Sequence, residues 1–294
     1  MTTNRNSSTI YAVLLMFLAI ASFTMMAIAG RYVSAELDTF EIMMYRSVIG
    51  MLIISTFAVF TNRVKSIKSE HFSLHISRNL FHFAGQNLWF YAITVIPLVQ
   101  VFALEFTVPI WVLLLSPIFL SESFTKPRVI AAVLGFGGIL IITRPAPDSL
   151  NFGLVAAALS AIGFAGSIMF TKTLTGRTNT LSILFFMTVI QLGFGILCAG
   201  YDGDIEMVSW SALPWVVAIG LAGLLAHLSL TTALTLAPAT VVTPIDFLRL
   251  PVIAYVGFAL FGETIDIYVA LGVILIFVGN YTNILAQHRQ TSAS

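Results

Sequence analysis

Six ionisable side chains lie inside long apolar stretches and are the first candidates for chemistry: Arg46, His82, Glu105, His227, Asp246 and Arg249. An ionisable group at the centre of a bilayer costs about 2.5–3.5 kcal/mol on insertion scales, so each is expected to face a cavity or a partner. By depth along their segments, Glu105 is predicted to pair with Arg46 near one edge of the membrane. Asp246 and Arg249, three residues apart on one helical face, are predicted to pair near the opposite edge.

These two ion pairs predict a site for a small-molecule substrate, in which the charges change partners as the site opens to alternate sides. Glu105 or Asp246 is also a candidate to carry a proton as coupling ion. The alternative interpretation is that both pairs are static salt bridges that cancel charge inside a packed bundle.

Polar and aromatic neighbours complete the predicted substrate-binding set: Gln86, Asn87 and Trp89. His82 and Gln86 are four residues apart and therefore share a helical face. The indole of Trp89 suits stacking on a planar or cationic substrate. The alternatives are interfacial packing for Trp89 and simple helix–helix hydrogen bonding for a lone polar residue such as His227.

Composition indicates that lipid is the main solvent of this chain. Hydrophobic residues make up 58% of its 294 residues and charged residues 9%, against about 25% charged residues in soluble domains. This excludes a disordered chain, a basic nucleic-acid-binding protein and an ordinary soluble enzyme, so no nucleic acid partner is expected. A single cysteine, Cys198, excludes an internal disulfide and a cysteine-based zinc site. Neither a cofactor nor a metal is expected.

Ten apolar segments are each long enough to cross a bilayer as a helix, which predicts an all-α integral membrane protein. They lie near residues 10–30, 40–60, 79–96, 99–120, 128–144, 152–171, 181–200, 211–234, 239–260 and 267–286. With the N-terminus inside, ten Lys and Arg residues fall on the inner side and two, Arg31 and Arg144, on the outer side. The positive-inside rule therefore predicts cytoplasmic tails at 1–9 and 287–294.

The chain contains an internal repeat. At an offset of 141 residues and without gaps, Pro97 meets Pro238, Glu105 meets Asp246 and Gly138 meets Gly279. The repeats span 10–145 and 151–286, and each holds five predicted spans. Because five is odd, the second copy enters the membrane upside down. Inverted five-helix repeats around a central cavity are typical of secondary transporters, which bind substrate near the midplane.

Several short motifs resemble one family. They are the stretch from Asn87 to Ile93, Pro109, Ser121-Glu122, and Phe261-Gly262-Glu263. Together they resemble the EamA-type, ten-helix branch of the drug/metabolite transporter superfamily, although Ser121 stands where the family usually has glycine. The resemblance implies a multi-pass carrier in the cell inner membrane of a prokaryote. Substrates in that family include amino acids, nucleoside-like metabolites, riboflavin and S-adenosylmethionine.

Three further pairs of residues carry structural predictions. Pro109 and Pro251 lie inside the fourth and ninth spans and are predicted to kink them. Glu122 and Glu263 are each predicted to cap the helix that follows. Ala131 and Gly135 have the small-xxx-small spacing that permits close helix packing, at the bundle edge or in a homodimer.

The function predicted from the sequence is secondary transport of a small polar metabolite by alternating access. The alternatives are an intramembrane enzyme or a non-transporting membrane scaffold. An enzyme is disfavoured because the sequence contains no HExxH, GxSxG or P-loop motif.

Overall fold

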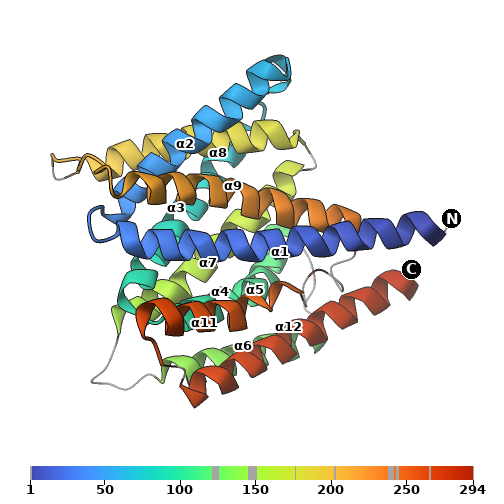
Figure 1. Ribbon diagram of the computed structural model, residues 1–294. Helices are drawn as coiled ribbons and strands as arrows, with labels where there is room; N and C mark the ends of the chain where they lie inside the picture. Colours follow the sequence, from blue (N-terminus) through green and yellow to red (C-terminus); the bar gives the residue numbers. More distant parts are fainter. Residues whose placement is uncertain are drawn as a thin grey trace.

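The computed structural model describes residues 2–120, 126–144, 151–175, 177–201, 203–237, 242, 245–264 and 266–293. Glu122 and Pro238, which carry predictions above, lie outside these residues. All regular structure in the described part is helical, as predicted, and the helices pack lengthwise into a bundle (Figure 1).

The first repeat contains α1 (Thr2–Val33), α2 (Thr39–Phe60), the short 3-10 turn η1 (Val64–Ser66), α3 (Phe72–Val95), α4 (Leu98–Glu105), α5 (Val108–Leu120) and α6 (Lys126–Thr143). The second contains α7 (Phe152–Thr175), α8 (Thr180–Ala199), α9 (Leu213–Leu236), α11 (Arg249–Phe261) and α12 (Ile267–Ala293). When 141 is added to the first and last residue numbers of α3 and α5, the results are the bounds of α9 and α11. The gapless repeat is therefore confirmed.

Local sequence explains where several helices begin. Asp38 accepts a hydrogen bond from the backbone of Glu41 and Glu41 returns one, which forms a capping box at the start of α2. Asn179 caps α8 in the same position of the second repeat. Six segments of the described chain are long and apolar enough to cross a membrane alone. Three shorter apolar helices, Val129–Thr143, Arg249–Phe261 and Ile267–Thr282, together with α3 at the third predicted span, bring the number of spans in the described chain to ten.

The fourth span is broken rather than merely kinked. α4 ends at Glu105 and α5 begins at Val108, with Pro109 in its first turn, where the missing backbone donor costs nothing. The ninth span has a turn at the equivalent place, just before α11, and Pro251 again lies in the first turn. The prolines thus lie at the start of new helical segments, rather than kinking continuous helices as the sequence analysis predicts.

The contact between α6 and α12 confirms that the repeats are inverted. A Cβ added to Gly138 would lie 2.7 Å from the carbonyl oxygen of Gly272, and one added to Gly279 would lie 2.9 Å from that of Ala131. Gly138 and Gly279 are equivalent at the offset of 141, and so are Ala131 and Gly272. Exchanging the repeats therefore turns the first contact into the second, as a two-fold axis does. Residue numbers rise along α6 as they fall along α12, so these equivalent helices, side by side in Figure 1, are antiparallel.

The small residues that were predicted to permit close helix packing lie at this contact between α6 and α12. The close backbone approach of α6 and α12 lies within one chain, and Gly135 makes room for the side chain of Ile110. Pairs α1–α9 and α3–α7 likewise join one repeat to the other. The start of α1 and the end of α12 lie at the same end of the bundle (Figure 1). We call this the terminal end, and the opposite end the distal end.

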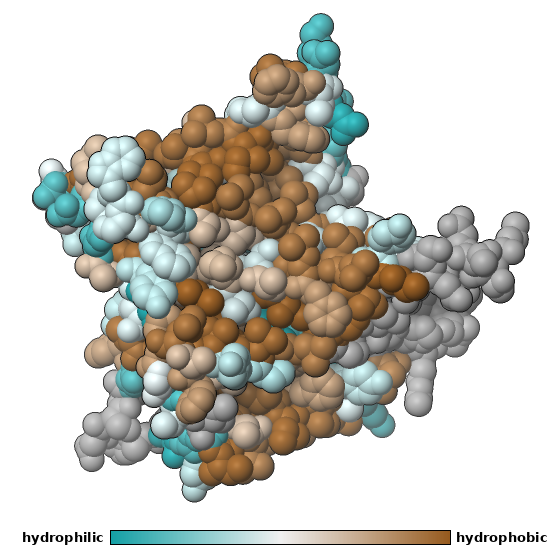
Figure 2. All heavy atoms as spheres, in the orientation of Figure 1, coloured by the Kyte–Doolittle hydropathy of each residue, from teal (hydrophilic) through white to brown (hydrophobic). Residues whose placement is uncertain are grey.

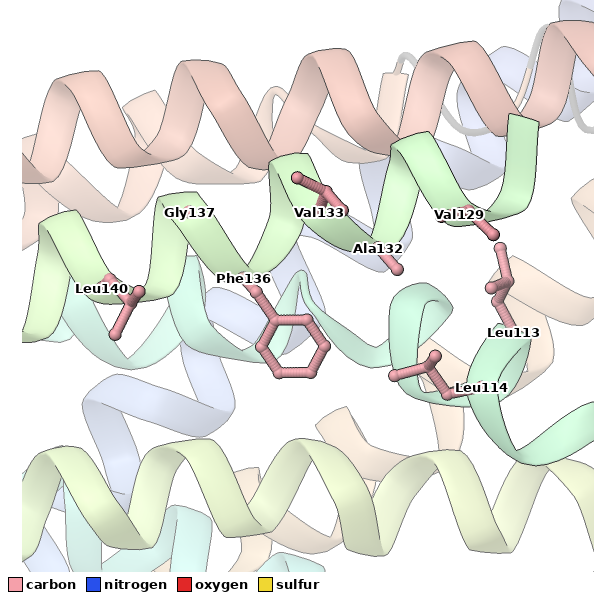
Figure 3. A pocket seen from close by; sticks show the side chains of 8 residues that line it. All are labelled: Leu113, Leu114, Val129, Ala132, Val133, Phe136, Gly137 and Leu140. Carbon is pink, nitrogen blue, oxygen red and sulfur yellow. The ribbon is translucent and has the colours of Figure 1, made fainter. Parts of the chain in front are cut away.

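The visible surface is dominated by apolar side chains, as a lipid-facing surface requires (Figure 2). An apolar pocket of about 460 Å³ lies between α5 and α6 (Figure 3). Its lining carries no polar side chain, and Val133 and Leu140 are largely exposed at its edge. It therefore belongs to the lipid-facing surface, and a polar substrate needs a different site.

Candidate functional site

The two helix breaks meet at a buried charge cluster, which we call the acid centre: Glu105, Asp246 and Arg249. Nη1 of Arg249 lies 3.1 Å from Oε1 of Glu105, and Nη2 lies 3.6 Å from Oδ2 of Asp246. Trp89 donates from its indole nitrogen to Oε2 of Glu105 at 2.8 Å. One arginine therefore serves two carboxylates that occupy equivalent positions of the repeats.

The predicted pair of Glu105 with Arg46 is wrong. The estimate compared only the depths of the two residues, and depth does not fix the direction in which a side chain points. Glu105 lies at the end of α4, and its carboxylate contacts Arg249 at the start of α11. The predicted pair of Asp246 with Arg249 is present.

Aromatic rings surround the acid centre. The guanidinium carbon of Arg249 lies 4.5 Å from the ring centre of Phe23, 5.2 Å from that of Phe102 and 4.8 Å from that of Phe106. Such contacts stabilise a desolvated cation. Phe106 also stacks on Phe247, its repeat equivalent, with ring centres 4.6 Å apart. Two equivalent residues can touch only near the pseudo-two-fold axis, so the acid centre lies where the halves meet.

A second polar cluster is connected to the first through ring contacts. His227 lies against Phe23, with ring centres 5.7 Å apart, and its ring lies 5.9 Å from that of His82. Nδ1 of His82 is 2.9 Å from the amide nitrogen of Gln191, which also donates to Asn79 at 3.2 Å. His82 and His227 are thus brought together as predicted site residues.

Arg46 lies close to this second cluster and away from the acid centre. It lines a small cavity between the repeats together with Ser47, Thr188 and Gln191. The cavity measures about 10 Å³, room for about one water molecule. A Cβ on Gly223 would lie 2.9 Å from the guanidinium of Arg46. Any larger residue at this point of α9 would therefore have to displace the guanidinium of Arg46.

The remaining predicted residues lie on the buried face of α3. Gln86 and Asn87 are buried, and the amide nitrogen of Asn87 donates to the carbonyl of Phe83 at 2.8 Å. The side-chain oxygen of Asn87 is buried without a hydrogen-bond partner. Asn87 therefore has a spare acceptor inside the bundle.

The sequence analysis missed Arg78 as a site residue because it counted this arginine as a solvated charge at the inner edge. Arg78 is buried. It donates to Asn79 at 2.9 Å and to the hydroxyl of Thr171 at 3.3 Å. Its spacing of four residues from His82 was the available signal, because residues four apart share a helical face.

The distal end is closed by a cluster that we call the distal latch: Arg31, Glu263 and the backbone of residues 93–98. Glu263 forms an ion pair with Arg31 and accepts hydrogen bonds from the backbone N–H of Leu98, at 2.9 and 3.1 Å. The prediction that Glu263 caps the following helix is therefore wrong. The chain turns back at Gly262, in a left-handed conformation that glycine favours, and directs Glu263 to the start of α4 in the other repeat.

Two residue ranges, 10–144 and 151–285, match the model of the EamA-like transporter family. Together they cover nearly the whole chain. The chain belongs to this family. The predicted resemblance and the two repeats are thereby confirmed, and this EamA protein is a membrane transporter rather than an enzyme or a scaffold.

Individual relatives agree with the family. A riboflavin transporter of Brucella anthropi is 32% identical over 237 residues, which are 78% of this chain and 81% of the relative. An S-adenosylmethionine uptake transporter of Rickettsia bellii is 24% identical and covers 88% of both chains. A pseudopaline exporter of Pseudomonas aeruginosa is 27% identical over 90% of this chain and 93% of its own length. A solved crystal structure with 17% identity covers 95% of this chain and 98% of its own, with a TM-score of 0.65, which supports the fold.

Proposed function

We propose that this EamA protein carries a zwitterionic metabolite with a planar ring by alternating access, and that the substrate binds at the acid centre. The proposal depends mainly on one observation. Two carboxylates, Glu105 and Asp246, share the single cation of Arg249 at the junction of the two broken spans. The acid centre therefore carries one excess negative charge, and a buried unpaired charge favours binding of a cation.

The surroundings of the acid centre favour a planar ring on the substrate. Phe102, Phe106 and Phe247 present stacking surfaces beside the charges. The relatives are named for riboflavin and for S-adenosylmethionine, and both of those compounds contain a flat heteroaromatic ring. S-adenosylmethionine fits the acid centre better, because it also carries positive charge.

Counterflow in proteoliposomes tests this proposal. Vesicles loaded with unlabelled S-adenosylmethionine are expected to accumulate the labelled compound through the wild-type protein, and riboflavin, which has a flat ring but no charge, serves as the comparison. Glu105→Gln and Asp246→Asn should each reduce this uptake at least tenfold while the protein remains folded. Glu36→Gln, at an exposed acid of the distal loop, is the matched control. Unchanged uptake in both site variants would refute the proposed site.

The excess negative charge also supports a role for a coupling ion. A proton taken up by Glu105 or Asp246 would neutralise the acid centre when no substrate is bound. Proton coupling predicts that an imposed pH gradient drives uptake by the wild type, and that a protonophore, which collapses the gradient, abolishes this uptake. Counterflow without a gradient serves as the comparison.

The proposed location is the cell inner membrane, with both termini in the cytoplasm. The ten-to-two distribution of Lys and Arg supports this orientation. Single cysteines at Ser7 and at Gly203, in a Cys198→Ser background, should react with an impermeant thiol reagent from opposite sides. A homodimer would have to use faces other than the small residues that pack α6 on α12.

A further inference from the structure

Arg46 and Arg78 are two buried cations without an acidic partner. Both are more than nine-tenths buried, and no ion pair joins either of them to a carboxylate among the residues that the structure describes. Arg46 contacts the sulfur of Met43, at 3.8 Å, and Arg78 donates to the neutral side chains of Asn79 and Thr171. A buried cation in such surroundings is costly unless an anion joins it.

Both guanidinium groups border the same polar network. Arg46 lines the small cavity with Gln191. Gln191 hydrogen-bonds Asn79, which accepts from Arg78. The hydroxyl-bearing residues Ser47 and Thr188 line the cavity beside Arg46. Positive charge and polar side chains therefore converge on one point between α2, α3, α8 and α9.

We propose that Arg46 and Arg78 form an anion subsite that binds the carboxylate or phosphate group of the transported metabolite. This rests on the proposed function, since it assigns the second charge of the zwitterion. The acid centre has one excess negative charge, while Arg46 and Arg78 contribute two positive charges. Phe23 and His227 lie between the two centres and link them by ring contacts. A zwitterion that places a cationic group at the acid centre and its anionic group at Arg46 and Arg78 matches this distribution of charge.

The cavity beside Arg46 must widen before it can admit the proposed anion. At about 10 Å³ it holds about one water molecule and no carboxylate. Binding must therefore separate α2 from α8. The two helices approach closely here, since a Cβ on Gly50 would lie 2.9 Å from the side chain of Thr188.

Thermal unfolding in nanodiscs tests the anion subsite directly, with sodium acetate and inorganic phosphate as probes and sodium chloride as the ionic-strength reference. The Tm of the wild type should rise by about 3 °C at saturating acetate or phosphate. Arg46→Gln and Arg78→Gln should abolish the rise. Arg63→Gln, at an exposed arginine of the loop after α2, should retain it. An equal response of all four proteins, or no response in the wild type, would overturn the proposal.

Matched ligands show whether the anion belongs to the substrate. S-adenosylmethionine should stabilise the wild type more than its decarboxylated analogue, which keeps the ring and the positive charges, and Arg46→Gln should remove the difference. A rise that requires phosphatidylglycerol in the nanodisc would assign the anion to a lipid headgroup and overturn the proposal. Loss of ring-compound binding with an intact acetate response would count against the proposed function alone. Intact uptake with no anion response would count against the subsite alone.

Discussion

The distal latch gives the sharpest prediction about conformational change. Glu263 accepts two contacts from the backbone N–H of Leu98 and forms an ion pair with Arg31, whose other donors bond the carbonyls of Ile93 and Ile96. The Arg31 and Glu263 side chains are only 16% and 12% exposed, so solvent screens the pair little. Opening the distal end must break these contacts, because they tie the ends of α1 and α11 to α3 and α4.

Glu263→Gln keeps the shape of this side chain and removes its charge. A hydrogen bond to a charged group contributes about 1.5–3 kcal/mol, and a neutral one about half of that. We therefore expect the variant to lose about 2 kcal/mol of the free energy that holds the distal end closed. This corresponds to an increase of about 30-fold in the ratio of distally open to distally closed protein.

Double electron–electron resonance measures this ratio. Spin labels at Thr94 and Ile267, both exposed at the distal end, report the separation of α3 from α12 in a Cys198→Ser background. The Glu263→Gln variant should gain a population at longer distance, and Glu36→Gln should not. An unchanged distance distribution in folded Glu263→Gln protein would refute the reasoning, since the latch would then have no part in closure.

Three further predictions concern stability in detergent. Arg249→Met leaves two buried carboxylates unpaired and should cost about 3–5 kcal/mol of unfolding free energy; adding Glu105→Gln should recover part of the loss in Tm. Trp89→Phe removes the indole hydrogen bond to that carboxylate and should cost about 1.5–3 kcal/mol, whereas Trp210→Phe, at a residue that is 89% exposed, should leave Tm unchanged. Gly138→Val forces α6 away from a backbone carbonyl of α12 and should lower Tm by several degrees, with an unchanged Tm contradicting the close packing.

The sequence predicted the architecture well because membrane spans and repeats are encoded by composition and by offset. The equivalence of Glu105 and Asp246 was visible before any coordinates, and both acids do reach one centre. The partner of Glu105 was not predictable, because a span that is apolar on both sides of its break reads as one continuous helix. The position of a residue along such a segment indicates its depth in the membrane. It does not indicate which neighbouring helix the side chain contacts.

The two buried arginines also differ in how far the sequence alone could reveal them. Arg46 was found because it interrupts an apolar run. Arg78 stands at the edge of such a run, where a charge is normally solvated, and only the packing of α3 on α7 and α8 buries it. The cross-repeat cap by Glu263 was equally hidden, since it joins residues 165 positions apart. Contacts of this kind depend on tertiary arrangement and leave no local pattern.

Arg249 has no counterpart in the first repeat, where the equivalent residue is Val108. If the two repeats were identical, the conformations open to the two sides of the membrane would have equal free energy. Arg249 is one of the differences between the repeats that remove this equality, because it makes the two conformations differ in how the two acids are neutralised. Position 249 and its equivalent, position 108, are therefore places where a substitution is expected to shift the balance between the two conformations.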